Sequence, residues 1–135
     1  MLIVTCALIV KNGKILITQN GEDSDHAFQW EFPGGKIKIN ETTEACIVRE
    51  IKEELELDVF IEKTLIPVEH DYGIKKIKLI PFICSIKQGL LKLNNHMNAK
   101  WVEVPNLLEI DFSEADKRLL MIDKNMQNLK EYTRK

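Results

Sequence analysis

Residues 41–57 constrain the fold most, because they form the clearest helix of the chain and β-prone segments lie on both sides of it. Asn40 or Thr42 can cap the start of this helix, and its interior contains neither glycine nor proline. A chain with a long helix between groups of strands is neither all-helical nor all-β. The sequence therefore predicts a single α+β or mixed α/β domain.

The predicted strands are the short β-prone runs at residues 1–10, 15–18, 30–32, 36–39, 59–66, 74–86 and 100–104. The first two runs surround Asn12-Gly13, which is the strongest short signal for a hairpin. Pro81 predicts an edge position or a bulge, because proline cannot donate to a strand ladder. Residues 20–28 are predicted as a loop. A second helix is predicted from Ser113 to Leu129, followed by a fraying end.

The composition excludes several classes of function. The formal net charge is −2, so there is no global basic field to hold a nucleic-acid backbone, and stable nucleic-acid binding is not expected. Residues 1–10 lack the features of a signal peptide, and no apolar stretch reaches the ~20 residues that a membrane span needs. Cys6, Cys46 and Cys84 have no zinc spacing and are expected to be buried free thiols. These observations predict a cytoplasmic protein with no membrane partner.

Three glutamates share one face of the predicted helix. A helix advances about 100° per residue, so Glu53 lies at about −60° and Glu54 at about +40° relative to Glu50. The apolar stripe that can pack on a sheet lies elsewhere on the helix and consists of Val48, Ile51 and Leu55.

Like charges at this spacing repel one another, and a divalent cation removes the repulsion. Carboxylate oxygens without histidine or cysteine suit Mg²⁺ or Mn²⁺ rather than zinc. The alternative is a solvated acidic helix face without a ligand. The preceding segment, WEFPGGK, favours a ligand, because Gly34 and Gly35 allow close approach of the backbone and Lys36 supplies a charge suited to phosphate.

The spacing of these residues resembles the Nudix box, G-x5-E-x7-R-E-U-x-E-E-x-G-U, in which U is a bulky aliphatic residue. Gly35, Glu41 and residues 49–57 match the box at every position except its final glycine, where this chain has Glu56. That glycine normally lets the chain turn out of the helix. The exit is therefore expected to differ in shape, or the helix to run slightly longer.

The resemblance extends beyond the box and covers roughly residues 2–125. Upstream, WEFPGGK resembles the MutT-type branch of the family. Downstream, residues 96–120 resemble the last strand and the closing helix of that branch. The resemblance implies the Nudix fold, an α+β arrangement (α/β/α sandwich) with a mixed β-sheet between helices. Residues 1–135 are then expected to be a single Nudix hydrolase domain.

The resemblance also implies roles for the residues of the box. Arg49 is expected to be a catalytic residue that orients a glutamate through a bidentate pair, and Glu41 to have either a secondary metal role or a structural one. One glutamate is expected to take the proton of the attacking water. The residues implied as metal ligands are the catalytic glutamates Glu50, Glu53 and Glu54 together with the backbone carbonyl of Gly35.

The sequence says less about the residues that bind the base than about those that bind the metal. Asp116 falls where MutT-like proteins often carry a side chain that hydrogen-bonds the base, although it also suits the first turn of a helix. Lys100 occupies the position at which some relatives carry another carboxylate, and His96 nearby is expected to be an exposed loop histidine. The residues expected to bind substrate are Lys36, Gly34, Gly35, Phe32 and Asp116.

The function implied is that of a MutT-like nucleoside triphosphate pyrophosphohydrolase. It would convert a (d)NTP, with 8-oxo-dGTP and CTP or dCTP among the candidates, to a monophosphate and pyrophosphate with Mg²⁺, for which Mn²⁺ can substitute. A monomer and a homodimer both remain open. The alternatives are hydrolysis of another nucleoside diphosphate linkage, as in a nucleotide sugar or a capped RNA end, and a non-catalytic nucleotide-binding module.

Overall fold

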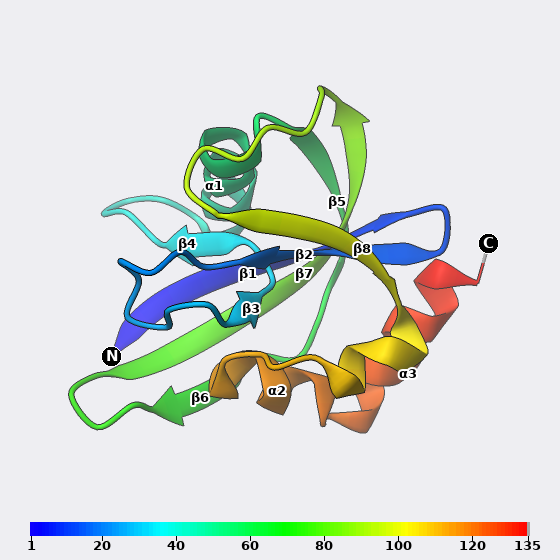
Figure 1. Ribbon diagram of the computed structural model, residues 1–135. Helices are drawn as coiled ribbons and strands as arrows, with labels where there is room; N and C mark the ends of the chain where they lie inside the picture. Colours follow the sequence, from blue (N-terminus) through cyan, green and yellow to red (C-terminus); the bar gives the residue numbers. More distant parts are fainter. Residues whose placement is uncertain (135) are drawn as a thin grey trace.

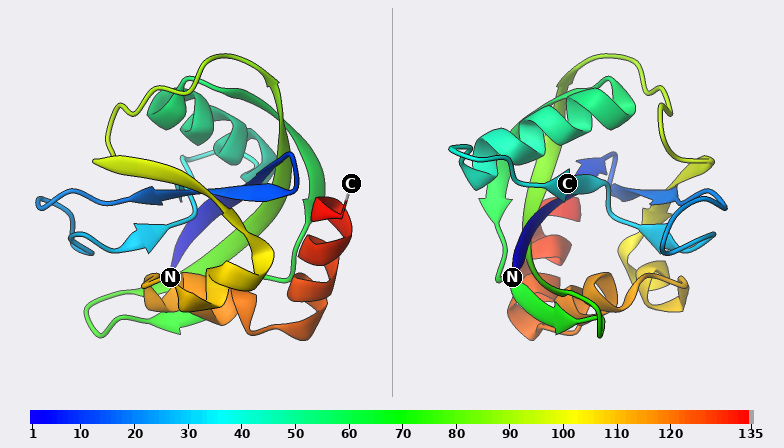
Figure 2. Two further views of the ribbon diagram at one scale, coloured as in Figure 1. Left: turned by 45° about the vertical axis from the view of Figure 1, so that its right-hand side comes forward. Right: turned by 90° about the vertical axis from the view of Figure 1, so that its left-hand side faces the viewer.

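The computed structural model describes residues 1–134 and consists of a mixed β-sheet between helices (Figure 1). Helix α1 (Thr43–Leu55) covers one side, and helices α2 (Glu114–Leu120) and α3 (Asp123–Thr133) lie on the other (Figure 2). The α+β sandwich predicted from the sequence is confirmed. No helix within residues 1–134 is long and apolar enough to cross a membrane.

The sheet has eight strands: β1 (Leu2–Lys11), β2 (Lys14–Gln19), β3 (Trp30–Glu31), β4 (Gly34–Lys36), β5 (Asp58–Thr64), β6 (Val68–Asp71), β7 (Lys76–Gln88) and β8 (Asn98–Glu103). Its main order is β3-β2-β1-β7-β5, while β4 pairs with β1, β6 with β7, and β8 with β2. Strands β1 and β7 are parallel and every other pair is antiparallel. A short 3-10 helix (Val104–Glu109) follows β8.

The predicted hairpin between β1 and β2 is confirmed, whereas the expectation that Pro81 lies on an edge strand is wrong. Pro81 pairs with Cys6 in the interior of the sheet. The carbonyl of Pro81 accepts from the N–H of Leu65, in the connection where β5 has ended and β6 has not begun. The nitrogen of Pro81 faces this gap too, because the N–H and C=O of one residue point to the same side of a strand. A missing donor is tolerated there.

A hydrophobic core lies on each side of the sheet, between the sheet and the helices. The core beneath α1 contains Ile47, Ile51 and Leu55, spaced four residues apart, and Val48 is 37% exposed. Ile51 and Leu55 of the predicted apolar stripe are confirmed, and Ile47 takes the place predicted for Val48. The second core lies between the sheet and the C-terminal helices. Cys6, Cys46 and Cys84 are buried and free, as predicted.

The second predicted helix is in fact two helices. The chain breaks after Leu120, and the buried side chain of Asn125 donates to the carbonyl of Leu119 at 3.1 Å. The same side chain also bonds the backbone of Ile66, accepting from its N–H at 2.7 Å and donating to its carbonyl at 2.9 Å. Helix α3 then continues to Thr133, so the predicted fraying end begins too early.

Helix α1 is shorter at both ends than predicted. Thr42 is the N-cap and accepts from the N–H of Ala45 at 3.1 Å, while Glu41 precedes the helix. At the other end Glu56 adopts the left-handed conformation, with φ 57° and ψ 30°. The helix does not run on. Its exit has the conformation that a glycine takes at this position, although the residue is a glutamate.

Candidate active site

The diglycine lies within β4 rather than in a loop between strands, and the predicted strand at residues 36–39 is wrong because β4 ends at Lys36. A Cβ on Gly34 would overlap the backbone of β1 at Thr5 and Cys6. A Cβ on Gly35 would overlap the carboxylate of Glu50. Both glycines are therefore needed for close approach, one to a strand and one to the acidic helix.

Gly34 and Gly35 point their backbone groups in opposite directions. The ladder pairs Thr5 with Gly35, and the carbonyl of Gly35 also accepts from the hydroxyl of Thr5 at 3.3 Å. The N–H of Gly34 instead donates to Oε1 of Glu54 at 3.1 Å. Since N–H and C=O of one strand residue share a side, the carbonyl of Gly34 faces the acidic helix. Sequence reasoning chose Gly35 as the carbonyl ligand, but the geometry favours Gly34.

Arg49 holds the glutamates at the start of the site. Its guanidinium donates to both carboxylate oxygens of Glu41, through Nε at 2.6 Å and Nη2 at 2.9 Å. Its Nη1 donates to Glu50 at 2.9 Å and to Glu53 at 3.2 Å. The expected bidentate pair exists, and its partner is Glu41. Hydrogen bonds from Arg49 lower the pKa of Glu41 to about 2.

Glu54 is the buried member of the acidic face. It lies on the same side of α1 as Glu50 and Glu53, but its hydrogen bond comes from the N–H of Gly34 rather than from Arg49. Burial, together with the negative charges of Glu31 and Glu50, raises the pKa of Glu54 to about 8. A cation placed beside this carboxyl would relieve the unfavourable charge.

The donor set fits a divalent cation in its chemistry, because it consists of carboxylate and carbonyl oxygens. Within residues 1–134, however, no three His, Cys, Asp or Glu side chains converge closely enough to form a preassembled metal cage. Glu50 and Glu53 are turned toward Arg49 instead. Binding a cation would therefore require these two carboxylates either to leave the guanidinium or to contact the guanidinium and the cation together.

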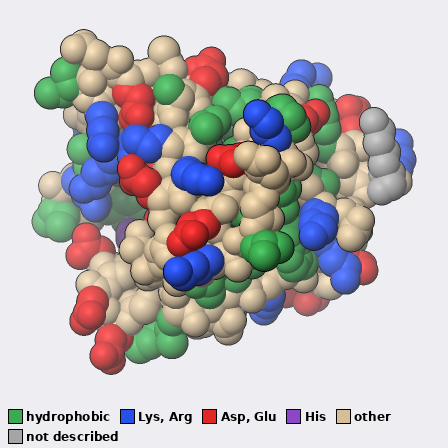
Figure 3. All heavy atoms as spheres, turned by 90° about the horizontal axis from the view of Figure 1, so that it is seen from above, with side chains coloured by type: hydrophobic (Ala, Val, Ile, Leu, Met, Phe, Trp, Pro, Cys, Tyr) green, Lys and Arg blue, Asp and Glu red, His purple; other side chains and the backbone are tan. Residues whose placement is uncertain are grey.

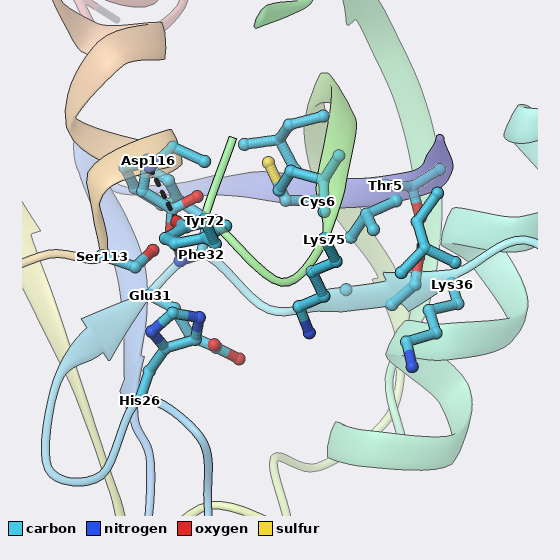
Figure 4. A pocket seen from close by; sticks show the side chains of 17 residues that line it. Thr5, Cys6, His26, Glu31, Phe32, Lys36, Tyr72, Lys75, Ser113 and Asp116 are labelled. Atoms are coloured by element: carbon cyan, nitrogen blue, oxygen red, sulfur yellow. Dashed lines mark hydrogen bonds between the residues drawn. The ribbon is translucent and has the colours of Figure 1, made fainter. Parts of the chain in front are cut away.

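A cavity of about 200 Å³ extends from this region toward α2 (Figure 4). Lys36 and Thr5 lie at one end, Phe32, Ser113 and Asp116 lie at the other, and Lys75 points into the space between them. Lys36 is exposed, so its ammonium is free to meet an anion at the mouth. The cavity thus joins the glycine strand to the residues expected to read the base.

Phe32 and Asp116 meet at the closed end, as expected from the sequence. The ring of Phe32 is buried and stacks on Phe112 at 4.8 Å, so this residue both belongs to the core and lines the cavity. Asp116 is 4% exposed, and its Oδ2 accepts from the N–H of Phe32 at 3.1 Å. Burial, with Glu31 nearby, raises the pKa of Asp116 to about 8. A protonated carboxyl can donate a hydrogen bond as well as accept one.

Sequence reasoning missed Glu31 and misplaced His96. The side chain of His96 is 3% exposed rather than solvated, and its Nε2 lies 2.9 Å from Oε2 of Glu31. Both residues line a second hollow of about 360 Å³, which also reaches Glu54. Lys100 lies with its ammonium over the ring of Trp30, at 4.6 Å from the centroid. No local pattern predicted that Glu31 shares a site with Phe32, because alternation along a strand places adjacent side chains on opposite faces.

The face above α1 carries acidic and basic side chains intermixed, without a broad patch of one sign (Figure 3). This distribution agrees with the net charge of −2. An anionic substrate would therefore depend on local groups, such as a bound cation and the lysines at the cavity, rather than on a long-range field.

Comparison with known proteins shows which proteins this chain is similar to. A family model described as NUDIX domain matches residues 1–121. A CTP pyrophosphohydrolase of Escherichia coli K12 is 30% identical over 120 residues, covering 89% of each chain. An 8-oxo-dGTP diphosphatase of Buchnera aphidicola subsp. Schizaphis graminum is 28% identical, covering 87% of this chain and 88% of its own. The solution structure of the MutT protein, a Nudix hydrolase, of methicillin-resistant Staphylococcus aureus 252 is 31% identical, with a TM-score of 0.75 over 94% of this chain and 96% of its own.

Proposed function

Since this chain belongs to the NUDIX domain family, we propose that it is a nucleoside triphosphate pyrophosphohydrolase of the MutT type. It hydrolyses a (d)NTP to the nucleoside monophosphate and pyrophosphate. The names of the two relatives support a substrate from the nucleotide pool, with CTP, dCTP and 8-oxo-dGTP as the first candidates.

One observation carries this proposal: a single cavity runs from the glycine strand, which hydrogen-bonds Glu54 of the acidic helix, to a buried carboxyl beside an aromatic ring. The first end suits a cation and phosphates, and the second suits a base. Lys36 and Lys75 line the space between, where a negatively charged chain would lie. A nucleotide has these parts in this order.

We propose Mg²⁺ as the cofactor, with Mn²⁺ as a substitute, held by Glu50, Glu53, Glu54 and the carbonyl of Gly34. When bound, the cation neutralises phosphate charge and lowers the pKa of a water molecule. Arg49 orients Glu50 and Glu53, and an α1 glutamate receives the proton of the attacking water.

At the other end of the cavity, Asp116 pairs with the polar edge of the base. The ring of Phe32 provides an apolar wall for it. The donor and acceptor atoms that the pocket presents then determine which base is preferred.

The test is a panel of nucleoside triphosphates incubated with Mg²⁺, with the products separated by chromatography. We expect a monophosphate and pyrophosphate from at least one triphosphate, and no turnover in EDTA. Orthophosphate and a diphosphate as first products would contradict the proposed bond. Preferential cleavage of nucleotide sugars or capped RNA ends would replace the substrate class, and tight nucleotide binding without hydrolysis would indicate a binding module.

A further inference from the structure

The loop at residues 89–97 is attached to the end of the acidic helix. The backbone N–H of Asn94 donates to the carbonyl of Glu54 at 3.0 Å, and its side chain donates to the carbonyl of Glu53 at 2.8 Å. The last carbonyls of a helix lack partners within the helix, so the loop supplies donors that the helix cannot. The position of this loop is therefore tied to the position of the glutamates.

The same loop buries His96 against Glu31. The Nε2 atom lies 2.9 Å from Oε2 of Glu31, and within residues 1–134 the buried Nδ1 atom has no hydrogen-bond partner. A buried N–H without an acceptor is costly, whereas an unpaired lone pair costs less. The proton of a neutral His96 therefore belongs on Nε2, which makes the ring a donor to Glu31.

Glu31 is held from two sides. Its Oε1 accepts from the side-chain amide of Asn20 at 3.1 Å, while Oε2 faces His96. Its side chain remains 24% exposed and lines both the cavity and the second hollow. Figure 4 places its carboxylate at the same end of the cavity as Phe32 and Asp116. A carboxylate with both oxygens anchored and one side open presents acceptors at a fixed place.

We propose that His96 is a positioning residue, which holds the Glu31 carboxylate at the wall between the two hollows so that it accepts hydrogen bonds from the nucleotide. A role in packing alone does not explain the geometry, because within residues 1–134 the one hydrogen bond of this buried ring goes to a partly exposed carboxylate on the cavity wall. Because residues 89–97 bond the end of α1 and also carry His96, the contact between His96 and Glu31 fixes Glu31 relative to Glu54. The proposal rests on the proposed function only in taking a nucleotide as the ligand.

The first test needs no catalysis. Nitrogen NMR of the histidine rings in the wild-type chain should show His96 protonated at Nε2, with a slowly exchanging Nε2 proton. Glu31→Ala should remove that protection. A ring protonated at Nδ1 alone, or an Nε2 proton that exchanges as fast in the wild type as in Glu31→Ala, would overturn the inference whatever the enzyme hydrolyses.

The second test is kinetic. His96→Leu keeps an apolar side chain of similar bulk but removes the donor, and we expect KM for the best triphosphate to rise about 10- to 100-fold with kcat within about threefold. His96→Gln can place an amide N–H near the position of Nε2 and should restore most of the loss. Met97→Ala, on the exposed neighbour in the loop, is the matched control and should leave KM unchanged.

A double-mutant cycle decides whether His96 acts through Glu31. On the background of Glu31→Ala, the change His96→Leu should cost little more, because its partner is already gone. Fully additive losses, or a fall in kcat at unchanged KM, would overturn the proposal. If His96→Leu fails to fold, His96→Gln and Glu31→Ala still provide the comparison. A folded wild type that hydrolyses no triphosphate would instead refute the proposed function and leave the NMR result standing.

Discussion

Two carboxyl groups at opposite ends of the site have opposite environments. Glu41, at the start of α1, receives two hydrogen bonds from Arg49, and its pKa is lowered to about 2. Asp116, at the closed end of the cavity, is held by the N–H of Phe32, and burial raises its pKa to about 8. The first end is an ion-pair network open to solvent, and the second is a buried group that is neutral near pH 7.

The two environments suit different functions. The charged end can exchange partners with a cation and phosphates, because its carboxylates are partly exposed and share one guanidinium. The neutral end can recognise a base through directional hydrogen bonds without bringing a charge into the apolar cavity. Glu54 lies between these extremes, since it belongs to the acidic helix but is buried like Asp116.

The largest expected effect comes from removing charge at the acidic end. Glu53→Gln and Glu54→Gln should each lower kcat/KM at least ~100-fold, the scale of losing a group that positions a metal. Both variants should remain folded, because glutamine keeps the length of the side chain and an oxygen that accepts the hydrogen bonds from Gly34 and Arg49. Glu44→Gln on the same helix is the matched control, since Glu44 is exposed and accepts a hydrogen bond from the hydroxyl of its neighbour Thr43. Near-normal turnover in both test variants would remove the acidic face from the mechanism.

Arg49→Lys tests whether the network at this end orients the glutamates. A lysine cannot reproduce the fork that bonds Glu41 and Glu50 together, so we expect kcat/KM to fall about 10- to 100-fold. The lowered pKa of Glu41 contributes stability that is present above about pH 4.5 and is lost as the pH falls toward 2. In the variant, the difference in the free energy of unfolding between pH 7 and pH 2.5 should shrink. Unchanged kinetics and an unchanged difference would contradict the role.

Asp116→Asn tests the neutral end, where the sign of the pH dependence is reversed. A folded-state pKa of about 8, above the unfolded value, gives stability that is full below about pH 4 and is lost as the pH rises to about 8. The variant should show a weaker decline over this window in denaturant titrations, while the contribution of Glu54 to the same decline remains.

The same variant should reorder the preference among bases. Asparagine keeps the shape of the side chain but changes its donors and acceptors, so the matched base loses most. Values of kcat/KM for four triphosphates on both proteins measure this. An unchanged ranking together with an unchanged pH slope would leave Asp116 with a purely structural role.

The smallest effect is expected at the exit of α1. Glu56 is left-handed, which favours glycine, so Glu56→Gly should stabilise the fold by about 0.5–1 kcal/mol. Its exposed ion pair with Lys92, at 3.7 Å, should contribute little. Glu56→Ala is the control and should bring no such gain. A loss of stability in Glu56→Gly, measured by denaturant unfolding, would contradict this explanation.

The two ends also differ in how far the sequence predicted them. The acidic face of Glu50, Glu53 and Glu54 depends on spacing within one helix, so helical periodicity was sufficient to place it. The end near Asp116 depends on contacts between distant segments. Phe32 and Asp116 are 84 residues apart, and Glu31 and His96 are 65 apart.

Local patterns failed where tertiary contacts decided the outcome. Strand β6 was missed, and the C-terminal helix was predicted as continuous because nothing nearby shows that Asn125 would bond both Leu119 and Ile66. The diglycine was predicted to lie between strands and to approach a ligand, whereas it lies within β4 and closely approaches β1 and Glu50. Such contacts are set by packing rather than by periodicity.

Binding of Mn²⁺ followed by NMR tests most directly whether α1 holds the metal. Small additions of the paramagnetic ion should broaden the backbone amides of Gly34, Glu50, Glu53 and Glu54 first, and should spare those around Asp116. Glu53→Gln should weaken this broadening, whereas Glu44→Gln should not. Broadening that centres on another surface, or that is the same in Glu53→Gln as in the wild type, would contradict a metal site on this helix.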